Sequence, residues 1–212
     1  MTRHRPTLRR IALTTLALLP LAASAATPGI PTLAQAQSAM DALFDAALAD
    51  RPATDSSRMV AEAFRPRLLA LSSCMPHSGA AIPTVDCITT AQAGPEPVYR
   101  LLRFTHAEGH WTMPIEQRHL PVPVPPTDRV QVLLRETFIA RAAQEADAGA
   151  RADLAQAART ADVVGVDACD IGEDAPVIEC QVSARVAGEQ GRQPMAFIRV
   201  DGQWQNAPAT PQ

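Results

Sequence analysis

The segment Pro83-Thr-Val-Asp-Cys87 returns 93 residues later as Pro176-Val-Ile-Glu-Cys180. In both places a tryptophan follows the cysteine at a distance of 24 residues, as Trp111 in the first case and Trp204 in the second. Self-similarity at a fixed period indicates an architecture built from repeated units. The sequence therefore predicts that the chain of 212 residues contains two tandem copies of a unit of about 93 residues.

The likeness between the two halves extends well beyond these segments. An acidic residue followed by glycine occurs in both halves at the same offset of 93. Residues upstream of the first cysteine correspond at an offset of 94 or 95. The further matches are Phe104 with Phe197, Glu108-Gly109 with Asp201-Gly202, Leu68-Leu-Ala-Leu-Ser-Ser-Cys74 with Val163-Val-Gly-Val-Asp-Ala-Cys169, and Phe44 with Phe138. A tandem duplication accounts for all of these matches at once.

Each half begins with helical periodicity. Apolar residues spaced by three and four predict one apolar helix face in each half. They are Met40, Leu43, Phe44, Ala47 and Leu48 in the first half, and Val130, Leu133, Leu134 and Phe138 in the second. A second helix is expected to begin near Asp55 and to end before Pro66. Thr127 or Asp128 is expected to cap the helix of the second half.

Short strand-like runs follow the helices. They cover 68–74, 84–92, 97–106 and 110–115 in the first half, and 163–169, 177–187, 194–200 and 203–206 in the second. Glu108-Gly109 and Asp201-Gly202 are two-residue hairpin signals. The predicted fold class is therefore α+β. It has two tandem repeats, each a helix or helix pair packed on a four-stranded antiparallel sheet.

The four cysteines are expected to form one disulfide in each repeat. The duplication pairs Cys74 with Cys87 and Cys169 with Cys180, each pair within one predicted hairpin. Each bridge would close a loop of about a dozen residues and contribute about 3 kcal/mol. The alternative is metal binding by four thiolates, but zinc sites usually contain closely spaced cysteine pairs.

Residues 1–26 are predicted to be a signal peptide. Four arginines precede the apolar run 11–19, and the small residues Ala23-Ser24-Ala25 follow it. A membrane anchor is the alternative, but the run is shorter than a membrane span requires. The first repeat then occupies 27–119, a proline-rich linker 120–127 and the second repeat 128–212. A polyproline II spacer is expected in the linker, rather than a ligand for a proline-binding domain.

Composition argues against several classes of function. The chain carries 19 basic residues, all arginine, and 22 acidic residues, with 4% aromatic residues. Cleavage after residue 26 would remove four arginines and no acid, and the net charge would change from −3 to −7. A nucleic-acid partner is not expected, because such proteins present a basic face. An acidic surface favours a cationic partner.

No familiar catalytic motif is present, and neither a catalytic residue nor a cofactor is predicted. His106, Glu108 and His110 resemble a metal triplet along one strand. A turn at Glu108-Gly109 would instead pair His106 with Trp111 and turn the two imidazoles to opposite faces. Asp86 and its counterpart Glu179 are expected to be solvent-facing strand residues, with a general base as the alternative.

The predicted tips of the two cysteine hairpins differ between the repeats. The first tip, 75–82, is apolar and uncharged, whereas the second carries several acids. The expected partner-binding residues are Met75, His77, Asp167, Asp170, Glu173 and Asp174. A calcium site is the alternative at the acidic tip, but no recognised calcium-loop spacing is present.

The order of elements resembles the cystatin-like and NTF2-like α+β superfamily. The resemblance rests on the apolar helices around Phe44 and Phe138 and on the closing hairpins that end at Trp111 and Trp204. It covers 33–115 and 128–207. Members of that superfamily include enzymes, inhibitors and binding modules, so the resemblance does not indicate one function. Its enzymes often hold a His–Asp pair between helix and sheet.

Three functional hypotheses follow. The first is a periplasmic or secreted non-catalytic module that binds another protein, such as an immunity protein or an inhibitor of a toxin or hydrolase. The second is a small-molecule binder or enzyme of the NTF2-like kind, which would have an open pocket in one repeat only. The third is a structural envelope protein that assembles through strand edges.

Overall fold

The computed structural model describes residues 29–49, 51–52, 54–77, 80–115, 117 and 120–208. The predicted signal peptide and His119 lie outside this part of the chain. The first repeat contains α1 (Leu33–Leu48), α2 (Ser56–Ala63), β1 (Arg67–Pro76), β2 (Thr84–Gln92), β3 (Pro97–Ala107) and β4 (His110–Thr112). The second contains α3 (Thr127–Gln144), α4 (Ala148–Thr160), β5 (Asp162–Ile171), β6 (Ile178–Val186), β7 (Glu189–Val200) and β8 (Gln203–Asn206).

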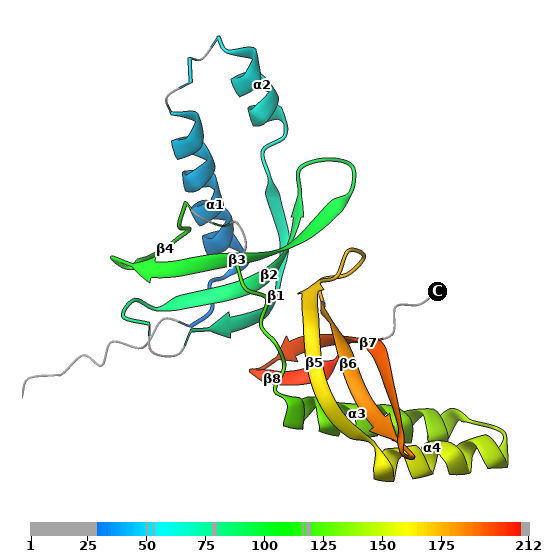
Figure 1. Ribbon diagram of the computed structural model, residues 1–212. Helices are drawn as coiled ribbons and strands as arrows, with labels where there is room; N and C mark the ends of the chain where they lie inside the picture. Colours follow the sequence, from blue (N-terminus) through cyan, green and yellow to red (C-terminus); the bar gives the residue numbers. More distant parts are fainter. Residues whose placement is uncertain are drawn as a thin grey trace, which may run out of the picture.

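The predicted α+β class and the duplication are confirmed. Each repeat has a four-stranded antiparallel sheet in simple meander order, preceded by two helices (Figure 1). The turns at Glu108-Gly109 and Asp201-Gly202 adopt the positive φ angles that a two-residue hairpin turn requires. β4 is shorter than predicted and ends at Thr112.

The first helix of each repeat lies against its sheet, and some predicted details are wrong. In α1 the buried face consists of Ala36, Ala39, Met40 and Leu48, whereas the predicted core residue Ala47 is exposed. In α3 the predicted residues Val130, Leu133 and Leu134 are buried. No side chain caps α3, because its N-cap is Pro126 and Thr127 is already helical.

A glutamine in each first helix binds the beginning of the first strand. The Gln37 side chain accepts from the Leu68 amide at 2.7 Å and donates to the Pro66 carbonyl at 3.3 Å. Gln131, 94 residues later, accepts from Val163 at 2.6 Å and donates to Ala161 at 2.8 Å. The repeated bonds fix helix against sheet by satisfying backbone groups that no neighbouring strand pairs.

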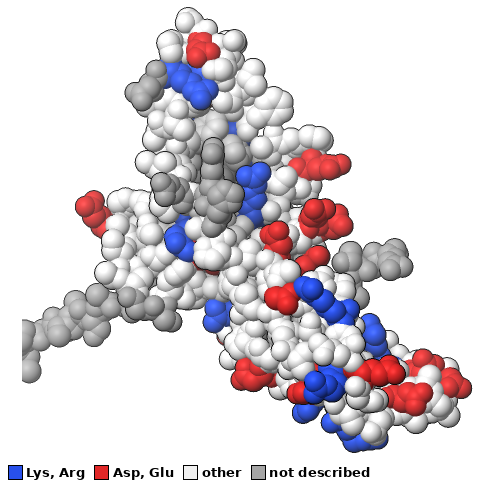
Figure 2. All heavy atoms as spheres, viewed as in Figure 1, with Lys and Arg blue, Asp and Glu red and all other residues white. Residues whose placement is uncertain are grey.

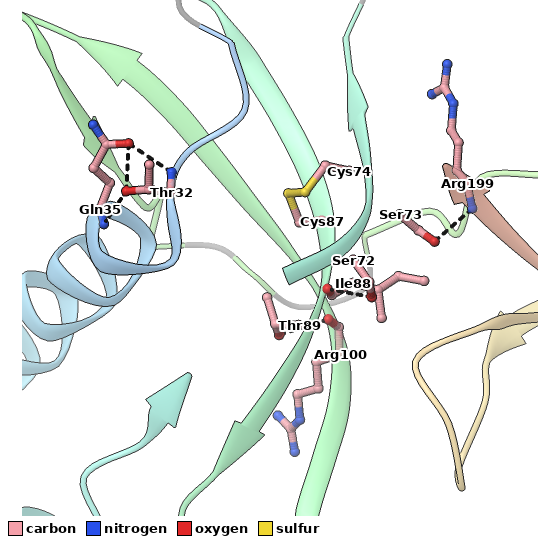
Figure 3. Close-up of a disulfide and its surroundings, with 10 residues drawn as sticks. All are labelled: Thr32, Gln35, Ser72, Ser73, Cys74, Cys87, Ile88, Thr89, Arg100 and Arg199. Carbon is pink, nitrogen blue, oxygen red and sulfur yellow. Dashed lines mark hydrogen bonds between the residues drawn. A yellow bond between two sulfur atoms is a disulfide. The ribbon is translucent and has the colours of Figure 1, made fainter. Parts of the chain in front are cut away.

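A bulge in the first strand positions each disulfide. Ser72 pairs with Ile88 and Met75 with Asp86, so Ser73 and Cys74 together oppose the single residue Cys87. The same two-against-one arrangement places Ala168 and Cys169 opposite Cys180. Ser73 and Ala168 adopt left-handed φ angles of 46° and 47°. The predicted disulfides Cys74–Cys87 and Cys169–Cys180 are both formed. Figure 3 shows the first of them.

The two repeats share one apolar core. Met75, Ile88 and Leu101 of the first repeat belong to the same buried cluster as Leu133 and Phe197 of the second. β1 packs against β7, and β3 against β5, so the elements meet in reciprocal pairs. The Arg199 amide donates to the Ser73 hydroxyl at 2.9 Å across the joint (Figure 3).

The proline-rich connection takes part in this core. Leu120 and Val122 pack against the shared cluster, and Pro125 is fully buried. The segment therefore anchors the two repeats to each other in addition to connecting them.

Replacing Ala168 with glycine tests the left-handed bulge. Ala168 is exposed, and glycine adopts its φ without the Cβ clash, so Ala168→Gly should stabilise the oxidised protein by about 0.5–1 kcal/mol. Urea unfolding followed by circular dichroism measures the effect. Ala152→Gly, in the exposed interior of α4, is the control and should destabilise by about 1 kcal/mol. Equal losses in both variants would contradict the bulge.

Candidate functional site

The two disulfide tips, equivalent by duplication, have different structures. At an offset of 95, Met75 corresponds to Asp170 and His77 to Gly172. Met75, a predicted partner-binding residue, is 6% exposed and lies in the shared core, so it is not accessible in this structure. Its side chain is the apolar anchor of the joint on the β1–β7 side.

His77 is exposed but engaged by a buried carboxylate. Its Nε2 lies 2.7 Å from Asp86 Oδ2, and Arg103 donates to both oxygens of Asp86 at 2.7 and 2.8 Å. Asp86 is 4% exposed, so the expectation of a solvent-facing position is wrong. The side chains of His77 and Arg103 cover the face of the sheet to which Asp86 points. Glu179 is exposed, as predicted, and the residue equivalent to Arg103 is Ala196.

Electrostatics keep Asp86 ionised. Burial acts to raise the pKa of Asp86, but the hydrogen bonds from Arg103 and His77 outweigh it and hold the pKa below its ordinary value. Gln117 fixes the Arg103 backbone by accepting from its amide at 2.9 Å and donating to its carbonyl at 3.1 Å. The cluster of His77, Asp86 and Arg103 therefore links the end of β1 to β2 and β3 through paired charges and hydrogen bonds.

The second tip is folded, and its acids point to solvent. The Gly172 amide donates to the Val177 carbonyl at 2.9 Å, and the Val177 amide donates to Ala175 at 2.8 Å. A Cβ at Gly172 would lie 2.9 Å from the Ala175 carbonyl oxygen, so this close turn requires glycine. Beyond it, Glu173 and Asp174 are exposed.

The predicted acids of the second repeat are not equivalent. Asp167 forms an ion pair with Arg192 on β7. Asp170, Glu173 and Asp174 take part in no ion pair among the residues that the structure describes. Acidic side chains gather over this tip beside the joint between the repeats (Figure 2). Three carboxylates are thus available there to a positively charged group.

A groove opens on the β3–β5 side of the joint. Its volume is about 480 Å³, and it is lined by Tyr99, Arg100, Leu101, Leu102, Gln117, Leu120, Val122, Asp170 and Ile171. At the equivalent position of the first repeat, Met75 is buried in the shared core. Asp170 stands in its place here, and an unpaired carboxylate is too costly to bury. Asp170, which stands where the first repeat has methionine, is therefore exposed and lines this groove.

The histidines of the last hairpin behave as the turn predicts. His106 pairs with Trp111 and Ala107 with His110, and the His106 ring contacts the Trp111 indole edge-on with 5.1 Å between centroids. Within the described ranges, no three histidine, cysteine, aspartate or glutamate residues are grouped to hold a metal ion.

No protein-family model, curated protein or solved structure matches the chain. None of the described helices is long and apolar enough to cross a membrane. The two disulfides fit an oxidising compartment such as the predicted extracytoplasmic one.

The sequence predicted the acidic residues of the site, but it did not predict the residues that line the groove opposite Asp170. Tyr99, Leu102 and Gln117 approach Asp170 only because the two repeats pack together. The one available signal was the exchange of Met75 for Asp170 between matched segments, since an apolar residue in one copy of a repeat marks a contact that the other copy lacks.

The Asp86 cluster predicts a pH-dependent stability. Because the pKa of Asp86 is lower in the folded protein than in the unfolded chain, its carboxylate stabilises the fold above about pH 3.9. This stabilisation disappears as the pH falls through the lowered pKa. Asp86→Asn should cost about 2 kcal/mol at pH 7, because the partly buried Arg103 loses its counter-charge.

Urea unfolding of both proteins between pH 2.5 and pH 7 measures the difference. The gap between them should be constant at neutral pH and should shrink below about pH 4. Glu179→Gln, at the exposed equivalent position, is the matched control and should change stability by less than about 0.5 kcal/mol. A gap that is independent of pH would show that the carboxylate charge is not responsible.

Proposed function

We propose that this chain is an exported, non-catalytic module that binds a basic protein in the groove between its repeats. Asp170 carries the proposal: it is a tip carboxylate without an ion pair among the described residues, and it forms part of the groove wall. Tyr99 and Leu102 lie in the same groove. Aromatic and apolar residues beside an accessible charge form the kind of centre from which protein interfaces draw most of their affinity.

The surroundings of the groove support a cationic partner. Glu173 and Asp174 extend the negative surface from the groove along the second tip. Negative charge at the edge of an interface accelerates association with a basic surface and discriminates against acidic ones. A disulfide behind each tip favours a preorganised surface, which lowers the entropic cost of binding.

Within this class, an inhibitor or immunity protein that neutralises an exported toxin or hydrolase fits these features. The predicted signal peptide, the two disulfides and the acidic groove support that assignment. The helix-then-four-strands order of each repeat also supports a relationship to the cystatin-like and NTF2-like superfamily, in which inhibitors and binding modules occur.

The test uses the oxidised chain without residues 1–26 as bait, with envelope and secreted fractions as prey. A stoichiometric basic partner should be captured by the native protein and identified by mass spectrometry. Asp170→Met, which introduces the residue of the first repeat and removes the carboxylate from the groove wall, should leave the fold at least as stable and weaken binding at least tenfold.

Two further variants locate the interface. Glu173→Arg with Asp174→Arg should slow association and reduce its dependence on salt. The matched double variant Glu108→Arg with Glu136→Arg reverses two exposed carboxylates elsewhere and should bind normally. Capture that persists unchanged in Asp170→Met would contradict the groove, and the absence of any basic partner from both fractions would contradict the class of function.

A further inference from the structure

The two equivalent phenylalanines of the first helices have different surroundings. In the first repeat, the guanidinium of Arg65 lies over the ring of Phe44, with 4.5 Å to its centroid. Arg65 is in turn held by carboxylates of Asp45 at 2.6 Å, Asp41 at 3.6 Å and Glu62 at 3.8 Å. An aromatic face and nearby carboxylates thus bind a cation that the chain itself supplies.

In the second repeat no described guanidinium lies over the corresponding ring. Phe138 lies 94 residues after Phe44, and the position 95 residues after Arg65 is Thr160. Its neighbour Arg159 donates to the Gln156 side chain at 2.6 Å and does not lie over Phe138. The only guanidinium found over an aromatic ring in the described ranges is that of Arg65. The second repeat therefore keeps the aromatic ring, but none of its described guanidinium groups covers it.

Phe138 instead forms part of the wall of an open groove between α3, α4 and the β6–β7 hairpin. The groove has a volume of about 610 Å³, and its apolar wall includes Leu134, Leu154 and Val182. This volume lies within the range of small-molecule sites, and a single arginine side chain would occupy only part of it. The groove is at the opposite end of β6 from the acidic tip, so it is separate from the proposed protein interface.

The charges on the groove leave it negative. Asp153 on α4 and Glu189 at the start of β7 both line it, and neither forms an ion pair with any described residue. Arg192 also lines the groove, but its guanidinium is paired with Asp167. An organic cation would therefore meet an aromatic ring and two uncompensated carboxylates, as Arg65 does in the first repeat.

We propose that this groove binds a small organic cation, with a guanidinium or ammonium group carried on an apolar body. The cationic group lies between Phe138 and the carboxylates of Asp153 and Glu189, and the apolar body lies along the wall formed by Leu134, Leu154 and Val182. This binding site is independent of the partner protein and of the groove between the repeats.

Hexylguanidinium is the probe, and hexanol and hexanoate are its neutral and anionic counterparts. Titration calorimetry of the oxidised chain without residues 1–26, together with backbone amide NMR, should show saturable binding of the cation. The perturbed amides should lie in α4 and at the start of β7. Hexanol should bind at least tenfold more weakly and hexanoate more weakly still. Equal affinity for hexanol, or no saturation by the cation at millimolar concentration, would overturn the proposal.

Conservative variants separate recognition from folding. Glu189→Gln and Asp153→Asn alter exposed side chains and should each weaken the cation about three- to fivefold without affecting hexanol. Phe138→Leu should produce a similar loss, because it keeps an apolar residue and removes the aromatic face. Phe44→Leu, the equivalent change in the first repeat, and Asp41→Asn, which removes one of the carboxylates around Arg65, should leave the affinity unchanged. A loss of equal size in these controls would also overturn the proposal.

Discussion

Two residues of β1 stand against one residue of β2, and much of the structure depends on that mismatch. The extra residue, Ser73, adopts a left-handed conformation, and Cys74 then lies opposite Cys87. The bend directs the end of the strand toward the second repeat. Met75 reaches the shared core there, and the Ser73 hydroxyl accepts from Arg199. One local irregularity thus sets both a covalent bond and the joint between the repeats.

The same backbone feature serves a different purpose in the second repeat. Ala168 repeats the left-handed angle of Ser73, but it has no hydroxyl to accept a hydrogen bond across the joint. Asp170 occupies the position equivalent to that of Met75, which is buried in the shared core. The two repeats therefore share the backbone bulge, but the residue that follows it is buried in the first repeat and exposed in the second. Asp170 lines a groove there, together with residues of β3 and of the proline-rich segment.

The fold could be predicted from local sequence signals, because each hairpin and each disulfide is determined by a few residues close together in the sequence. The acid-glycine turns determine the pairing of the last hairpins, and the repeat determines the cysteine pairs. Strand alternation failed at Asp86, because it assumes that one face of the sheet is open to solvent. His77 and Arg103 cover that face, and nothing in the spacing of these residues indicates that they meet.

The arrangement of the two repeats was beyond local reasoning for a similar reason. Met75 looked like part of an exposed tip because its burial depends on residues about 100 positions away. The proline-rich segment has the composition of a spacer, yet Pro125 is buried, since its side chain is apolar and the joint provides a place for it. The groove at this joint is lined by residues of both repeats, so it could not be predicted from either repeat alone.

The reciprocal contact of β1 with β7 and of β3 with β5 is the arrangement of a symmetric homodimer whose two subunits have been joined in one chain. In a true homodimer every substitution appears twice, so exchanging methionine for aspartate would open both sides of the interface together and weaken the assembly. Fusion removes that restriction. One side can hold the two halves together while the other changes independently, which two identical subunits cannot do.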